Sequence, residues 1–415
     1  MVIKDWKRVF NSMSYFLKQI FFKKNFDVVF VCSTYFNRGK KGENILFKPM
    51  IECCKKNNLN YVIFEDTYFK SHIDFRVNEN SISFDFILII QIILKKIYNL
   101  IYKQPISLDE IYLQDLKVAK IVRRLFFKKF NSKIYITLIW NNVTLWRVIS
   151  PSASVVDYQH GYIFDGEEEF MKDGRPPRVK LDNNVEALVH GHKYKSILID
   201  NDKSGFYNEN NVITVGLEKP SYSKKNFSEM NRKILFTLQL VPDFDKKINE
   251  RYVNTIEKLI DINSEYFLSN NYEIIFKHHP RYVSENCPKI NINHSFVSFD
   301  DKTPLSELFN KVGLHMTFHS TSAFDAALIG LPTIFVDMHE SFSPDEMFLN
   351  QYQYPCNDLV VKNFKNLKRI LKNITNEKTY NHYCNDVYEW SKEFYHDFDE
   401  EIFENFLLDR INKHN

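Results

Sequence analysis

Short apolar runs rich in β-branched residues alternate with helical segments along most of this chain, and this alternation constrains its fold more than any other feature. In the first half, buried strands are predicted at FDVVFVCS (26–33), YVIF (61–64), KIYITLIW (133–140) and ASVVDYQ (153–159). Strands that are connected through helices pair in parallel, and a parallel sheet is covered by helices on both faces. The first half is therefore predicted to be a Rossmann-like α/β domain.

The second half repeats the pattern. Strands are predicted there at KILFTLQ (233–239), EIIFKHHP (273–280), LHMTFH (314–319) and PTIFVD (332–337). Charged helices follow from Asn363 onward, and a polar segment containing Pro220 separates the halves. The predicted domains are residues 1–218 and 233–415, joined by a linker at 219–232.

Length and charge agree with two globular domains. The 415 residues are too many for one ordinary core and suit two domains of roughly 200 residues each. Lys plus Arg is 55 and Asp plus Glu is 52, so the net charge of +3 gives no reason to expect a nucleic-acid partner. The six cysteines show no CxxC spacing, which argues against a zinc site and favours reduced thiols in a cytoplasmic protein.

Two apolar segments bear on the membrane. Residues 1–24 lack the features of a signal peptide, but they have helical spacing with one apolar stripe, among basic residues: Ile3, Trp6, Phe10, Met13, Leu17, Ile20 and Phe21. Such a helix either lies in a membrane interface or packs against its own domain. The stretch 84–102 is too short to span a bilayer and is interrupted by Gln91, Lys95 and Lys96, so a buried helix is predicted there in preference to one that docks on a membrane.

Two Rossmann-like domains are expected to leave a cleft between the carboxyl ends of their sheets, where ligands bind. The motif YQHGY (158–162) directly follows a predicted strand, and glycine allows a sharp turn that exposes His160. A histidine there can accept a proton from an attacking hydroxyl. A capping turn is the structural alternative. The rival candidates for the base are the acidic residues of the next loop: Asp165, Glu167, Glu168 and Glu169.

A second motif, KHHPRY (277–282), also stands at the end of a predicted strand. Lys277, His278 and His279 place several donor or cationic groups before Pro280. Such a group suits a phosphate leaving group, whose negative charge needs donors. The adjacent histidines have no carboxylate partner in the pattern, so no metal site is predicted.

The third motif is FHSTSAFDAALIGLPTIF (318–335). Ser320, Thr321 and Ser322 stand where a helix is predicted to begin, and backbone N–H groups at a helix start bind anions. Asp325 lies one turn further, where its carboxylate can accept hydrogen bonds from ribose hydroxyls.

Together, these motifs resemble bacterial surface-glycan transferases of the GT-B fold. That group includes sialyl- and polysialyltransferases, Kdo transferases and teichoic-acid glycerophosphotransferases. The resemblance is best over 233–340 and implies that His279, Pro280 and residues 320–322 hold the phosphate of a cytidine nucleotide. The acceptor base of the family would fall on His160 before Gly161. Here Gln159 and His160 replace the acidic pair of the sialyltransferases, and Asp165 with Gly166 is the nearest acidic-Gly pair.

We therefore expect a metal-independent GT-B glycosyltransferase that uses no cofactor. Its donor would be a nucleotide sugar, and a CMP-linked sugar is one candidate. The first domain would bind a glycan or lipid-linked glycan acceptor of capsule, lipopolysaccharide or O-antigen synthesis, and the second would bind the donor. The expected location is the cytoplasm, with peripheral contact to the inner membrane. The alternatives are a CDP-glycerol-type glycerophosphotransferase, a sugar-nucleotide epimerase of the same fold, and a non-catalytic assembly scaffold.

Overall fold

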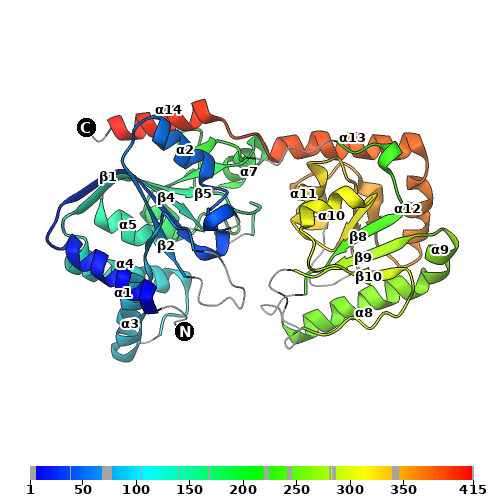
Figure 1. Ribbon diagram of the computed structural model, residues 1–415, viewed down its shortest axis with the longest axis horizontal. Helices are drawn as coiled ribbons and strands as arrows, with labels where there is room; N and C mark the ends of the chain where they lie inside the picture. Colours follow the sequence, from blue (N-terminus) through cyan, green and yellow to red (C-terminus); the bar gives the residue numbers. More distant parts are fainter. Residues whose placement is uncertain are drawn as a thin grey trace. The chain divides into compact units, whose positions relative to one another are not determined.

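A computed structural model of the chain describes residues 6–37, 39–67, 77–102, 104–139, 141–166, 169–218, 224–240, 245–279, 282, 287–338 and 345–413. The chain divides into two compact units, which Figure 1 shows together. The first unit consists of residues 1–219 and 395–415, and the second consists of residues 220–394.

A seven-stranded parallel sheet forms the centre of the first unit, in the order β3-β2-β1-β4-β5-β6-β7. In chain order the strands are β1 (Lys24–Ser33), β2 (Tyr61–Asp66), β3 (Ile82–Ser83), β4 (Phe130–Leu138), β5 (Ser154–Tyr158), β6 (Val185–Val189) and β7 (Val212–Thr214). The direction of strand succession reverses between β1 and β4, and Rossmann-like sheets bind their ligands at this point.

Helices cover both faces of this sheet. They are α1 (Trp6–Gln19), α2 (Lys48–Lys56), α3 (Asp85–Ile101), α4 (Leu108–Phe126), α5 (Val143–Ile149), α6 (Arg178–Asp182), α7 (His192–Asn201) and α14 (Glu400–Asn412). Side chains alternate along β1, so Val29 and Val31 face a core built with α1, α3, α4 and α5 around Trp146. Val28 and Phe30 face the opposite core, which α2 and α14 complete.

The second unit repeats this topology with a six-stranded parallel sheet in the order β10-β9-β8-β11-β12-β13. Its strands are β8 (Lys233–Thr237), β9 (Glu273–Lys277), β10 (Val297–Phe299), β11 (Leu314–Thr317), β12 (Thr333–Val336) and β13 (Val360–Val361). Its helices are α8 (Lys246–Ile262), α9 (Ser264–Ser269), α10 (Leu305–Lys311), α11 (Ser322–Ala327), α12 (Asn366–Ile374) and α13 (Glu377–Phe394). Phe324 of α11 stacks on Trp390 of α13 with ring centroids 4.8 Å apart, which fixes α11 to the body of the unit.

The predicted α/β class with two parallel sheets is confirmed. One domain assignment differs: residues 395–415 belong to the first unit, whereas the sequence placed them in the second domain. The reason is that Phe403, Phe406 and Leu407 of α14 are buried against α2 and the first sheet. Part of the predicted linker, residues 219–223, lies outside the described residues. Among the helices of the described residues, none is long and apolar enough to cross a membrane.

Candidate functional site

His160 follows β5 at the carboxyl edge of the first sheet, as the sequence predicted. Gln159 fixes the turn, because its Nε2 donates to Gly161 O (2.5 Å) and its Oε1 accepts from the His190 N–H (2.8 Å). The turn itself does not require glycine, since φ of Gly161 lies outside the left-handed region and an added Cβ would meet no atom within 4 Å. Gly161 therefore leaves open space beside the histidine rather than relieving strain.

The His160 ring is neutral at physiological pH. Its side chain is 27% exposed. Its Nδ1 is buried without a hydrogen-bond partner among the described residues, and Glu169 Oε2 lies 3.7 Å from it, at ion-pair distance. Burial lowers the pKa of His160 to about 4; Lys180 also lowers this pKa, and the Asp157 carboxylate opposes the shift. The ring of Phe36 packs edge-on at 5.4 Å. A neutral imidazole with a carboxylate beside Nδ1 can accept a proton at Nε2, and the carboxylate then stabilises the cation.

A buried ion pair supports this region. Lys180 Nζ of α6 lies 2.7 Å from Asp157 Oδ2 of β5, and both side chains are almost fully buried. The Thr137 hydroxyl donates to the other Asp157 oxygen (3.3 Å), and Lys180 also lies over the Phe170 ring. Sequence reasoning missed this pair. The signal was a charged residue inside the otherwise apolar strand ASVVDY.

A second histidine lies near His160. His190 directly follows β6 and is buried between the rings of Tyr158 (5.1 Å) and Tyr395 (5.7 Å). Neither of its ring nitrogens has a hydrogen-bond partner among the described residues, and burial lowers its pKa to about 3. The segment 190–192 reads HGH directly after a strand, and this repeat of the QHG pattern could have identified it.

The loop carboxylates separate into different environments. Asp165 Oδ1 accepts a hydrogen bond from the Gly174 N–H (2.9 Å), which ties the loop together. Glu169 is buried beside His160. Glu167 and Glu168 lie outside the described residues.

In the second unit, two of the predicted phosphate ligands are held by neighbouring groups. Lys277 Nζ donates to the backbone oxygens of Thr303 (2.7 Å) and Asp300 (3.3 Å). His278 pairs with Asp301 through both its backbone N–H (2.8 Å) and Nδ1 (2.9 Å), and its ring stacks on Tyr282 at 4.0 Å. These contacts shape the strand end. Either side chain would have to give up its protein partners to bind a phosphate.

His279, Ser320 and Thr321 are partly exposed at the ends of β9 and β11. These two strands lie on either side of β8 in the sheet. His319, which sequence reasoning did not select, also follows β11; its N–H donates to Gln239 Oε1 (2.9 Å), and its Nδ1 lies 3.2 Å from the Tyr252 hydroxyl. Pro280 lies outside the described residues.

Ser322 has a different environment from its two neighbours. Its hydroxyl is buried 2.9 Å from Thr237 Oγ1 and 3.3 Å from His315 Nε2. Backbone N–H groups at the start of α11 are also engaged: Ser322 N donates to Ser320 Oγ (3.2 Å) and Ala323 N to Ser320 O (3.1 Å). The Asp325 side chain is exposed on α11. Any anion held here would therefore depend on side chains more than on the helix start.

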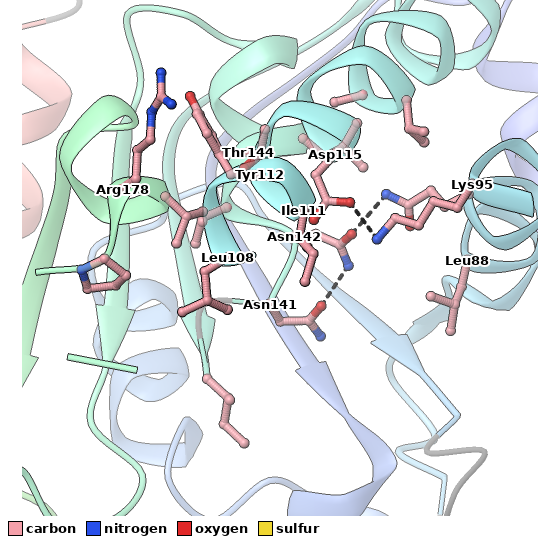
Figure 2. A pocket seen from close by; sticks show the side chains of 18 of the residues that line it. Leu88, Lys95, Leu108, Ile111, Tyr112, Asp115, Asn141, Asn142, Thr144 and Arg178 are labelled. Carbon is pink, nitrogen blue, oxygen red and sulfur yellow. Dashed lines mark hydrogen bonds and ion pairs between the residues drawn. The ribbon is translucent and has the colours of Figure 1, made fainter. Parts of the chain in front are cut away.

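The first unit also contains a pocket of about 380 Å³ between α3, α4 and α5. Figure 2 shows aliphatic side chains around a row of amides, in which Gln91 donates to Asn142 (2.9 Å) and Asn142 to Asn141 (2.6 Å), next to a 2.5 Å Lys95–Asp115 ion pair. The pocket is lined mainly by Leu88, Ile92, Leu108, Ile111, Val118, Val143, Leu145 and Val179, with Arg178.

This pocket reaches the same edge of the sheet as His160. Ile139 and Asn141 follow β4, the neighbour of β5. Ile139 has a φ of 52°, a left-handed conformation that is strained for a β-branched residue. Such strain is typical of functional sites.

One group of side chains in the described part of the chain could hold a metal ion. Ligand atoms of Cys53, Glu400 and Glu404 lie within 4.8 Å of one another, where α14 packs on α2. Glu400 already pairs with Lys56 (2.9 Å). None of these residues follows a strand of the sheet, so the group is separate from the candidate site.

No protein-family model and no curated protein matches the sequence. Among solved structures, the UDP-GlcNAc 2-epimerase of Methanocaldococcus jannaschii, in complex with UDP-GlcNAc and UDP, is similar over 94% of this chain and 100% of its own, with 13% identity and a TM-score of 0.54. S. aureus MnaA, solved with UDP, is similar over 94% and 96%, with 11% identity and a TM-score of 0.51. The wall teichoic acid polymerase TagF matches over 99% of both chains with 13% identity and a TM-score of 0.49. The chain therefore has the predicted GT-B fold of two Rossmann-like domains, which it shares with the M. jannaschii epimerase and MnaA.

Proposed function

We propose that this protein is a glycosyltransferase that moves a sugar from a nucleotide-activated donor to a growing capsule, lipopolysaccharide or O-antigen glycan. The observation that carries the proposal is the His160 site. A neutral imidazole at the carboxyl edge of a Rossmann-like sheet, with a buried carboxylate 3.7 Å from its Nδ1, is suited to accept a proton from a hydroxyl.

In the proposed reaction, an acceptor hydroxyl attacks the anomeric carbon of the donor. A new C–O bond forms, the bond from the anomeric carbon to the phosphate oxygen breaks, and the nucleotide leaves with that electron pair. The hydroxyl proton passes to His160 Nε2, and Glu169 stabilises the resulting imidazolium. Asp165 is the rival base, although its tie to Gly174 favours a structural role.

The donor is proposed to bind the second unit without a metal ion. His279, Ser320 and Thr321 are partly exposed and are the proposed phosphate ligands; the side chains of Lys277, His278 and Ser322 are held by neighbouring protein groups. Two structures of the same fold hold UDP or UDP-GlcNAc, which supports a nucleotide sugar as the ligand class. His319 is added to the proposed phosphate ligands because it stands beside Ser320.

A sugar-nucleotide epimerase is the second candidate, because one of the similar structures with a TM-score above 0.5 is a UDP-GlcNAc 2-epimerase. A CDP-glycerol-type glycerophosphotransferase would differ from the first proposal only in its donor. A non-catalytic scaffold would bind the nucleotide without turnover.

We also propose a cytoplasmic location with peripheral contact to the inner membrane, where a lipid-linked acceptor would be met. The apolar stripe of α1 supports this. The helix packs on its own unit through Val9 and Phe16, whereas Trp6, Phe10 and Leu17 of the stripe face outward and are exposed.

The test begins with thermal shifts in CMP, CDP, UDP and GDP, since a ligand that binds only the native state raises its stability. Sugar nucleotides of the stabilising base are then incubated with and without glycan acceptors, and products are followed by NMR. Acceptor-dependent release of the nucleotide supports the transferase. An epimerised donor formed without acceptor would instead support the epimerase. Nucleotide binding without either product would support the non-catalytic scaffold.

A further inference from the structure

The connection between α3 and α4 carries an unusually exposed apolar surface. The sequence predicted a buried helix over 84–102, but only the first half of α3 is well covered, with Asp85, Ile87 and Gln91 buried. Toward its end, α3 exposes Leu100 to 86%, and Ile106 in the connection is 81% exposed. We call this surface the α3–α4 elbow; its exposed apolar residues are Ile93, Ile97, Leu100, Ile101, Tyr102, Ile106 and Leu108.

Four apolar residues of the elbow lie on one face of α3. Ile93, Ile97, Leu100 and Ile101 have the spacing of a helical stripe, and the stripe continues into the connection. Monomeric soluble proteins rarely leave so many adjacent aliphatic side chains in water, and such surfaces mark sites of interaction with proteins or membranes.

Basic residues lie along α3 and α4. Lys96 and Lys117 lie beside the elbow, with Lys117 Nζ 5.2 Å from the centre of the Tyr102 ring, whereas the others extend toward the opposite end of α4. Residues 84–130 contain nine Lys or Arg and four Asp or Glu, an excess larger than the +3 of the whole chain. Two of the acidic residues are neutralised, because Asp85 pairs with Arg8 (3.1 Å) and Asp115 pairs with Lys95 (2.5 Å). The other two, Asp109 and Glu110, are exposed in the first turn of α4, where Glu110 caps the helix start. The exposed basic residues are Lys96, Lys117, Lys120, Arg123, Arg124, Lys128 and Lys129.

We propose that the α3–α4 elbow inserts into the surface of an anionic bilayer. Aliphatic side chains would enter the headgroup–acyl boundary, and the lysines and arginines would attract the anionic headgroups. A second copy of this chain fits the surface less well, because it would bring two strongly basic helix pairs together. Exposed lysines are also depleted from the cores of protein interfaces. The inference rests on the peripheral location in the proposed function and assigns it to a defined surface.

The experiment measures binding of the full chain to phosphatidylcholine vesicles with and without phosphatidylglycerol. The double variant Leu100→Ser with Ile106→Ser should weaken binding to anionic vesicles by about ten- to hundredfold. The matched control is Ile262→Ser with Leu268→Ser in the second unit, where the two side chains are 53% and 52% exposed. The control should bind as the unchanged chain does. Binding should fall with added salt and with Lys96→Glu plus Lys117→Glu, because both lysines lie beside the elbow.

Three outcomes would overturn the proposal: no binding to anionic vesicles, equal binding of the elbow and control variants, or self-association that the elbow variant abolishes. The last would assign the surface to a second copy. Nucleotide thermal shifts of the same variants keep the two proposals apart. A protein that binds vesicles but no nucleotide would contradict only the proposed transferase. A protein that binds nucleotide but no vesicles would contradict only the insertion of the elbow into a bilayer.

Discussion

At the scale of single residues, His160 differs from an ordinary histidine because its ring is largely surrounded by protein. Burial disfavours the imidazolium, so the pKa of His160 falls to about 4. The ring is therefore fully available as a base at neutral pH. Its weakness as a base is offset if Glu169 stabilises the protonated ring during the reaction.

Replacing His160 tests this role directly. His160→Ala should lower kcat by about 10²–10⁴ while donor affinity stays nearly unchanged, because the proton is accepted only during the chemical step. Glu169→Gln should show a smaller loss in the same direction. Steady-state kinetics with one accepted donor make the measurement. If Asp165→Asn loses most of its kcat while His160→Ala stays nearly normal, the base is Asp165 in the loop and not His160.

The pH profile follows from the lowered pKa. Protonation of His160 removes the base, so kcat/KM should decline as pH falls toward about 4 and should stay level between pH 6 and 7. An ordinary exposed histidine would give an acid limb near 6.5. Rate measurements over pH 4.5–8, with stability checked at each pH, distinguish the two.

The hydroxyls of Ser320 and Thr321 should contribute to nucleotide binding, whereas the Ser322 hydroxyl should contribute to stability. Ser320→Ala with Thr321→Ala should weaken nucleotide affinity about tenfold or more, as should His279→Ala, since each hydrogen bond to a charged group is worth about 1.5–3 kcal/mol. Ser322→Ala should instead cost about 1–3 kcal/mol of stability, because it removes a buried hydroxyl that lies 2.9 Å from Thr237 Oγ1 and 3.3 Å from His315 Nε2. Titration calorimetry and thermal unfolding measure the two effects. Normal stability in Ser322→Ala would contradict the division.

At the scale of elements, the Asp157–Lys180 pair connects α6 to β5 inside the first unit. Lys180→Met should cost about 3–5 kcal/mol, because it leaves a buried carboxylate without its partner. On the same helix, Asp182→Asn breaks an exposed pair with Arg178 and should cost at most about 1 kcal/mol. Chemical denaturation compares them. Equal effects would mean that the buried pair is not what positions α6.

Most strands could be predicted from the sequence because buried parallel strands are continuous apolar runs: β1, β2, β4, β5, β8, β9, β11 and β12 all coincide with predicted runs. The strands β3, β6, β7, β10 and β13 were not predicted. The outward face of α1 was also ambiguous, since helical spacing defines a stripe but not what covers it. Of the candidate site, the positions of His160, His279 and Ser320 after strands were predictable. The proximity of Glu169 and the Asp157–Lys180 pair were not, because they depend on how loops and α6 fold back.

At the scale of the whole molecule, the first unit is built from two separate stretches of chain. Phe403 and Leu407 of α14 are buried in its core, although 175 residues of the second unit intervene in the sequence. Phe403→Ala should therefore destabilise the first unit by about 3–5 kcal/mol and leave the second unit unchanged.

Hydrogen exchange resolved along the chain can measure this. Exchange should become faster in β1 and α2, with β8 and β11 unaffected. The matched variant Phe324→Ala, in the core of the second unit, should show the reverse pattern. Faster exchange in β8 with Phe403→Ala would contradict the observed division of the chain.

The position of α14 also has a consequence for synthesis on the ribosome. Domains usually fold in the order in which they are translated, the N-terminal one first. Here the second unit has all of its residues once position 394 has emerged, whereas the first still lacks the side chains that close its core. The part of the protein that begins to be made first is thus the last to finish folding, and its unfinished apolar face stays open to chaperones throughout translation of the second unit.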